Sequence, residues 1–132
     1  MTLRLDVGSR IPIATTAMGR AYIAAASSTE RAEILGLIKS HEGAAWPEIK
    51  AGIEAAIVEY EQTGGCSSFG EWQKDVNAIA VAFVPAGGSP QLTLSCGGPA
   101  FSLSREHLLE KVRPTLLELV RSWEIQAAKN DG

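Results

Sequence analysis

Six polar side chains stand beside small or apolar segments and together could bind a ligand. Thr15 and Thr16 precede a helix-forming run, whose first turn would present unpaired backbone N–H groups and a partial positive charge that suit a carboxylate. The other four lie on strand-like segments: Ser67, Ser68, Asn77 and Ser95. A few polar groups converging on an apolar sheet are typical of a small-molecule pocket. Helix capping and local hydrogen bonds explain each residue singly as well, so both interpretations stay open.

The two cysteines are the candidates for nucleophilic chemistry. Cys66 and Cys96 both fall in strand-like segments, where cysteine usually packs as a small hydrophobic residue. An activated thiol needs a neighbouring base or a lowered pKa, and the sequence around neither cysteine supplies one. We expect free thiols in a reducing compartment and no catalytic residue, and keep a small cysteine-dependent enzyme as an alternative.

The histidines and glycines form no metal or nucleotide motif. His41 and His107 lie far apart, and neither has the spacing of a metal-ligand set. The GGS at Gly87 and the GGP at Gly97 lack the strand–glycine–helix order and the lysine of a phosphate loop. We therefore expect no metal and no cofactor, a tight turn at Gly87, and a strand end at Gly97 that would let a ligand approach closely.

Length and charge limit the classes of protein that remain. The 132 residues carry 12 Lys or Arg against 15 Asp or Glu, a net charge of −3, which fits one domain with its own core. The pI near 5.4 offers no basic footprint for nucleic acid. No apolar run reaches about 18 residues, and the N-terminus lacks the apolar core of a signal peptide. We expect a cytoplasmic domain that neither crosses a membrane nor binds DNA alone.

The N-terminal quarter predicts a strand and then a helix with unusually small side chains. Apolar and charged residues alternate over residues 3–7, which is typical of a half-buried strand. Thr15 or Thr16 can cap the following helix. One face of this helix carries Ala14, Ala17, Met18, Ala21, Tyr22 and Ala25. Such a face lets the helix backbone lie close to whatever it covers.

Three further helices are predicted. The first runs over residues 29–39 and is capped by Thr29. The second opens at Pro47, after a loop over residues 41–45, and stops at Gly64 and Gly65. The third begins after Ser104 and should kink at Pro114, which cannot donate to the carbonyl of Glu110. A frayed tail is expected over residues 129–132.

The strands are predicted at residues 66–69, 76–84 and 91–98. The last two flank a Gly/Pro-rich turn, so they should form a hairpin, and their apolar character places both in the centre of the sheet.

The order of these segments resembles a known family. RLDVGSRIPIATTAMGRAYIAA resembles the effector-domain motif of the isocitrate lyase regulator (IclR) family of bacterial transcription factors, where a strand and a turn lead into text such as LPLHATALGKALLA. DVNAIAVAFV, the GGS turn and LTLSCGGPAFSLSREHLLEKVRPTLLELV also match, in the same order. The resemblance covers nearly the whole chain.

The resemblance implies an α+β domain over residues 1–128, with a GAF/PAS-like curved antiparallel sheet and helices packed on it. In the family this domain follows a helix-turn-helix and a linker helix and makes dimer or tetramer contacts. Those elements, and the first helix and strands of the effector domain, are not in this sequence. We expect an N-terminally incomplete domain that reaches DNA only through a helix-turn-helix absent from this chain.

The resemblance also implies an effector pocket for a small organic acid or an aromatic metabolite. By position, Ala17 and Met18 would present backbone N–H groups at the start of the helix. Ser68 stands where relatives can carry an aspartate. Ala78, beside Asn77, stands where a relative carries a cysteine.

The last strand completes the implied pocket. Ser95 and, with a departure, Gly97 match paired serines there, so this pocket is less polar than its relatives'. Phe83 and Leu94 would form an apolar wall. The predicted effector site therefore comprises Thr16, Ala17, Met18, Ser68, Asn77, Ala78, Ser95 and Gly97.

We thus predict a non-enzymatic effector-binding and oligomerisation domain, a homodimer or homotetramer, in which a metabolite shifts a population of arrangements. A pure assembly module with a vestigial pocket is the other alternative.

Overall fold

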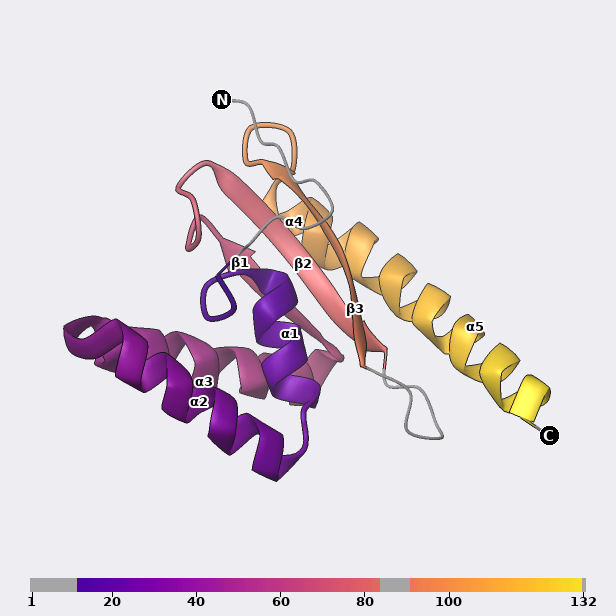
Figure 1. Cartoon of the computed structure of the whole chain (residues 1–132). Helices are drawn as coiled ribbons and strands as arrows, with labels where there is room; N and C mark the ends of the chain where they lie inside the picture. Colours follow the sequence, from indigo (N-terminus) through magenta and orange to yellow (C-terminus); the bar gives the residue numbers. More distant parts are fainter. Residues whose placement is uncertain (1–11, 84–90, 132) are drawn as a thin grey trace.

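Two layers of helix enclose a small antiparallel sheet. The computed structural model describes residues 12–83 and 91–131. Figure 1 shows α1, α2 and α3 on one face of the sheet and α5 on the other. The elements are α1 (Ala17–Ala25), α2 (Ser28–Glu42), a 3-10 turn (Gly43–Ala45), α3 (Trp46–Thr63), β1 (Gly65–Phe69), β2 (Val76–Phe83), β3 (Leu92–Pro99), α4 (Arg105–His107), a π-helical stretch (Leu108–Val112) and α5 (Arg113–Asp131). The α+β class is confirmed. The strand predicted at residues 3–7 and the turn at Gly87 lie outside the described residues.

The sheet has the order β1-β2-β3, and both pairs are antiparallel. The predicted hairpin is confirmed by the pairing of β2 with β3, from Val76 opposite Pro99 to Phe83 opposite Leu92. Within the described strands, however, only β2 is central. The prediction that both long strands are central is therefore wrong there for β3, whose apolar pattern comes from α5 covering one of its faces.

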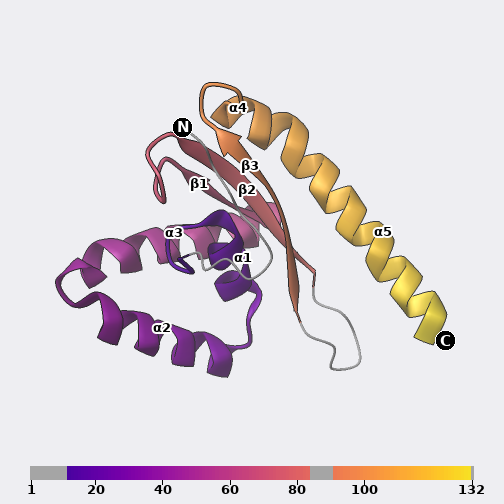
Figure 2. The ribbon, with the colours of Figure 1, turned by 45° about the horizontal axis from the view of Figure 1, so that its top comes forward.

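Small side chains form the contact between α1 and the sheet, as predicted for Ala17 and Ala21, whereas Tyr22 and Ala25, predicted on the same face, are only partly buried. Ala17 and Ala21 of α1 are 1% and 0% exposed and pack in one cluster with Cys66 of β1 and Ala80 of β2. Because alanine-sized groups separate the two layers, the helix packs closely against the sheet (Figure 2).

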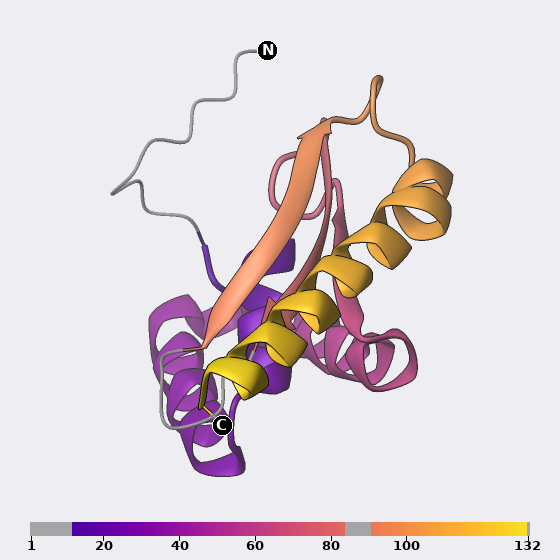
Figure 3. The same ribbon diagram turned by 90° about the vertical axis from the view of Figure 1, so that its right-hand side faces the viewer.

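The opposite face of the sheet carries the larger apolar residues. Ile79 and Val81 of β2 pack against Leu108, Leu116 and Val120. The long C-terminal helix α5 covers this face of the sheet (Figure 3). Successive residues of a strand point to opposite faces, so β2 gives alanines to the α1 side and branched residues to the α5 side. These two faces determine which predicted site residues can meet.

Helix ends differ in places from the predicted ones. Ser27, not Thr29, caps α2, because its hydroxyl accepts a hydrogen bond from the N–H of Glu30 at 3.2 Å. The helix then runs through Glu42, over part of the predicted loop. Gly64 ends α3 in the left-handed conformation, with φ 83°, as predicted. The residue types allow each of these ends, and α2 ends at Gly43, whose φ of 55° suits a glycine.

The last helix begins at Ser104, whose hydroxyl accepts from the N–H of His107 at 3.1 Å. The irregularity expected at Pro114 lies just before it, in the π-helical stretch Leu108–Val112. Wider turns here accommodate a proline that cannot donate to the preceding turn. α5 continues to Asp131, whereas the sequence predicts a frayed tail from residue 129.

Candidate functional site

The first turn of α1 begins with a threonine whose hydroxyl is fully engaged. Thr16 is 5% exposed; its Oγ1 accepts from the N–H of Gly19 at 3.1 Å and donates to the carbonyl of Pro12 at 2.6 Å. Thr16 is therefore the N-cap, as the sequence allows, and it also fixes the turn that enters the helix. Ala17 is buried beneath this turn, and Met18 packs beside it against the same small-residue cluster.

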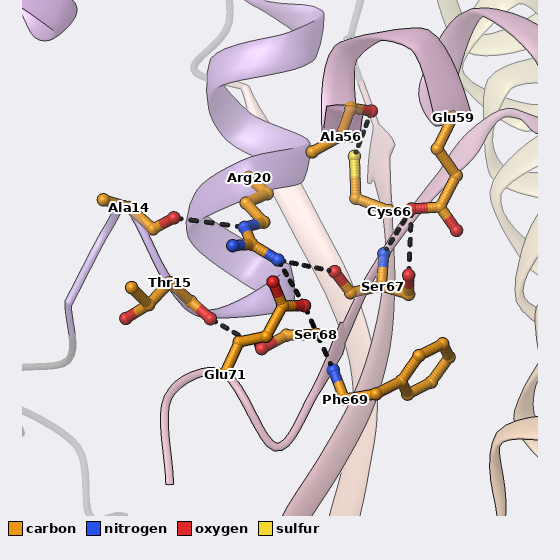
Figure 4. A network of polar contacts seen from close by, with 10 residues as sticks. All are labelled: Ala14, Thr15, Arg20, Ala56, Glu59, Cys66, Ser67, Ser68, Phe69 and Glu71. Carbon is orange, nitrogen blue, oxygen red and sulfur yellow. Dashed lines mark hydrogen bonds and ion pairs between the residues drawn. The ribbon is translucent and has the colours of Figure 1, made fainter. Parts of the chain in front are cut away.

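Three predicted site residues form one row across the sheet. Ser68 of β1 is opposite Ala78 of β2, which is opposite Gly97 of β3. Residues directly opposite each other share a face. The Ser68 hydroxyl donates to the carbonyl of Thr15 at 2.6 Å, so this row faces the start of α1 (Figure 4). Ser95, opposite Ala80, lies on the same face.

Gly97 lies opposite Ala78, at a point where the two strands approach closely. A Cβ at position 97 would lie 2.9 Å from the Cβ of Ala78. Seven of the eight predicted effector residues thus lie at the start of α1 or on the face of the sheet that α1 covers: Thr16, Ala17, Met18, Ser68, Ala78, Ser95 and Gly97.

Asn77 does not join them. Its side-chain amide donates to the carbonyl of Leu103 at 3.0 Å, on the face that α4 and α5 cover. Phe83 and Leu94, predicted as an apolar wall, pack on that same face, and Phe83 meets Trp123 edge to face with ring centroids 6.2 Å apart. The period of two in a strand could have excluded Asn77, since neighbours along β2 cannot share a face.

A buried arginine beside this row was missed in the sequence. Arg20 of α1 is only 5% exposed. Its Nε donates to the carbonyl of Ala14 at 3.1 Å, and its Nη1 donates to the carbonyl of Ser67 at 3.2 Å and to the Glu71 carboxylate at 2.8 Å (Figure 4). The signal was present: position 20 falls at helical spacing from Ala17 and Ala24, on the side that the small residues bury.

Two carboxylates line the same crevice as that guanidinium, and Glu71 is the one that contacts it. Partial burial raises the pKa of Glu71. The hydrogen bond and charge of Arg20, the N–H of Phe69 and the charge of Arg105 lower that pKa by more, so it lies below its ordinary value. Glu71 is therefore ionised beside Arg20 at neutral pH. The Glu59 carboxylate accepts from both the N–H and the hydroxyl of Ser67 at 2.9 Å.

Cys66 has the environment of an inert thiol. It is 0% exposed, and its Sγ donates to the carbonyl of Ala56 at 3.3 Å. Burial and then the charge of Glu59 raise the pKa of Cys66 to about 12, although Arg20 lowers it. The thiolate needed for nucleophilic attack is absent at neutral pH. Cys96 is partly buried among the apolar residues beneath α5.

Thiol labelling tests this assignment. With the protein folded at pH 7.5, we expect a thiol-specific reagent to leave Cys66 unmodified over hours, because the group is both buried and protonated, and to modify both cysteines after unfolding in guanidinium. Peptide mass spectrometry gives the site of each modification. Rapid labelling of Cys66 in the folded protein would instead favour the cysteine-dependent enzyme.

The described residues contain neither a candidate metal site nor a helix that could span a membrane. Across residues 12–83 and 91–131, no group of three or more His, Cys, Asp or Glu side chains could hold a metal ion. Within the same residues, no helix is long and apolar enough to span a membrane. Both histidines are exposed.

Comparison with known proteins gives the family. Residues 1–124 match the model of the bacterial transcriptional regulator IclR C-terminal domain. The chain belongs to the IclR family. The curated IclR relative, the helix-turn-helix-type transcriptional regulator TsaQ1/TsaQ2 of Comamonas testosteroni, is 26% identical over 127 residues, which cover 96% of this chain and 45% of that regulator.

Solved structures of IclR regulators have the same fold as this chain. An IclR family transcriptional regulator from Brucella abortus is 40% identical with a TM-score of 0.85, over 92% of this chain and 46% of that one. The inducer-binding domain of PobR from Acinetobacter, a double mutant in complex with 3-hydroxybenzoic acid, shares the fold at 18% identity and a TM-score of 0.65, over 89% of this chain and 69% of that one. The chain thus spans less than half the length of the curated relative and corresponds to the effector-binding domain of such regulators.

Proposed function

We propose that this domain senses a small organic acid or an aromatic acid bound beside the first turn of α1, on the α1-side face of the sheet, where Ala78 and Ser95 are partly exposed and Gly97 is exposed. The observation that carries the proposal is the row of Ser68, Ala78 and Gly97 opposite the first turn of α1. This row joins a helix N-terminus, with its partial positive charge, to a face of small side chains. The complex of the PobR inducer-binding domain with 3-hydroxybenzoic acid supports an aromatic acid for this fold.

The polar groups available to such a ligand are few. The hydroxyls of Thr16 and Ser68 donate to backbone carbonyls, so they shape the site. Ser95, partly exposed on β3, and the backbone N–H groups of Ala17 and Met18 are the donors that we assign to the acid group. The site would then recognise the carboxylate through a few hydrogen-bond donors and the rest of the ligand through the shape of the surface around it.

The sensing mechanism is a population shift in a homo-oligomer. An acid that binds one arrangement of the domain better than another favours that arrangement. A coupling free energy of about 1–3 kcal/mol changes DNA affinity by a factor of about 5 to about 150. DNA would be bound by a helix-turn-helix domain of the intact regulator, in the cytoplasm.

Calorimetric titration tests the site. We expect one acid among 3-hydroxybenzoate, benzoate, pyruvate and glyoxylate to bind, and Ser95→Ala to weaken that binding about fivefold, the value of one hydrogen bond. Ser122→Ala, an exposed serine on α5, is the matched control and should bind as wild type does.

Three results would count against the site. Binding that survives the joint replacement of Ser68 and Ser95 by alanine removes the row from the site. An equal loss in Ser122→Ala shows that the effect is not local. Stable oligomers in size-exclusion chromatography, with no response to any acid, would favour the assembly module.

A further inference from the structure

Arg20 joins the segment that enters α1 to the first strand. Ala14 belongs to the turn over residues 13–16, and Ser67 is the residue of β1 next to Ser68. The guanidinium donates to the carbonyls of both, at 3.1 and 3.2 Å (Figure 4). We infer that Arg20 is a positioning residue of the effector site, an inference that rests on the proposed function: it holds the first turn of α1 over the row of Ser68, Ala78 and Gly97.

A second tie connects the same two segments. The Ser68 hydroxyl donates to the carbonyl of Thr15 at 2.6 Å, one residue along from the Ala14 carbonyl that Arg20 binds. Two adjacent carbonyls of the entering turn are therefore bound from β1 and from α1 itself. A guanidinium donates from several nitrogens in a fixed planar arrangement, and here Nε serves Ala14 and Nη1 serves Ser67, whereas a lysine would donate to both segments from one nitrogen only.

The surroundings of Arg20 are specific to a guanidinium. On α3, a Cβ at position 52 would lie 2.8 Å from Nη2 of Arg20, so Gly52 leaves the space that this group occupies. A crevice of about 110 Å³ lies between Arg20, Gly52, Glu59 and Glu71. Its two carboxylates exceed the one guanidinium charge, which argues against an anion binding there. The ion pair with Glu71, whose side chain is 46% exposed, holds the guanidinium from its open side.

The opposite end of α1 supplies a matched control. Arg31 of α2 donates from Nε to the carbonyl of Ile23 at 3.1 Å and from Nη2 to the carbonyl of Ala24 at 2.6 Å. It too ties α1 to a neighbouring segment through backbone carbonyls, but far from the row in the sheet. Arg31→Met thus removes the same kind of interaction without touching the proposed site.

Hydrogen exchange measured by NMR tests the inference without any ligand. In Arg20→Met we expect the backbone N–H groups at positions 19 and 20 to exchange at least about tenfold faster, because the entering turn is released, while those of Ile79 and Val81 stay protected. Arg20→Lys, which keeps the charge opposite Glu71, should recover part of the protection. Arg31→Met should accelerate exchange at Ala26, the C-cap of α1, and leave Gly19 unchanged.

Acid binding gives the second readout. Arg20→Met should weaken the acid identified by calorimetry about tenfold at a temperature where it stays folded, Arg20→Lys should weaken it less, and Arg31→Met should leave it unchanged. If Arg20→Met does not fold, Gly52→Ala displaces the guanidinium without removing it and should give the same local exchange at Gly19.

Both measurements, hydrogen exchange and acid binding, can contradict the inference. Uniform acceleration of exchange over all elements, or none at Gly19, overturns the positioning role, as does local acceleration with unchanged affinity. Absence of any acid binding to the wild type refutes the proposed function instead, and the exchange result then decides alone whether Arg20 holds the turn.

Discussion

Replacement of Gly19 by alanine should destabilise the domain by about 3 kcal/mol or more. A Cβ at this position would lie 2.0 Å from the carbonyl oxygen of Ile13 and 2.5 Å from its carbonyl carbon. These are backbone atoms, so no rotamer change relieves the clash, and the turn over residues 13–16 must move. Helix propensity favours alanine by only about 1 kcal/mol, so the steric term decides the sign.

Urea unfolding of Gly19→Ala measures this effect. Gly36→Ala is the matched control, because Gly36 lies on α2 with nothing within 4 Å of its added Cβ. Propensity alone acts there, and we expect about 0.5–1 kcal/mol of stabilisation. A Gly19→Ala protein as stable as the wild type would mean that the entering turn does not rest on the first turn of α1.

Replacement of Ala21 by leucine should cost about 3 kcal/mol. Ala21 is 0% exposed, between α1 and the sheet, and its cluster contains Cys66 and Ala80, also 0% exposed. Three added carbons have no space in this layer, so α1 must move away from β2 or the side chain must adopt a strained rotamer. The same movement would separate the first turn of α1 from the row in the sheet.

Thermal unfolding of Ala21→Leu measures the cost. Ala32→Leu, an exposed position on α2, controls for the residue change itself and should change the free energy of unfolding by less than about 0.5 kcal/mol. A small loss in Ala21→Leu, equal to that of Ala32→Leu, would show that the contact between α1 and the sheet accommodates large side chains.

Much of the fold could be predicted from local patterns. A continuous apolar run marked β2, the threonine before a run of small residues marked α1, and Gly64 marked the end of α3, because each signal is local and its physical cause acts on neighbouring residues. The position of β3 at the edge of the described sheet could not be predicted in this way. Both long strands are apolar because α5 and α1 cover them, and pattern does not distinguish a covered edge strand from a central one.

The candidate site was predicted less completely, and for two different reasons. Asn77 was included as a polar side chain on an apolar strand, beside Ala78, although the pleat of the strand puts the two on opposite faces, and this error could have been avoided. The burial of Arg20 depends on hydrogen bonds to Ser67 and Glu71, which lie 47 and 51 residues away in the sequence. No local pattern encodes such contacts. A buried charge is set by the acceptors that surround it, and these come from the tertiary structure.

A ¹H–¹⁵N NMR titration of the wild-type domain with the same four acids locates the effector site directly. We expect one acid to shift the amide signals of Ala17, Met18, Ala78 and Ser95, while those of Asn77 and Leu103, beneath α4 and α5, change little. Shifts concentrated on the α5 side of the sheet, or no shifts with any of the acids, would contradict the proposed site.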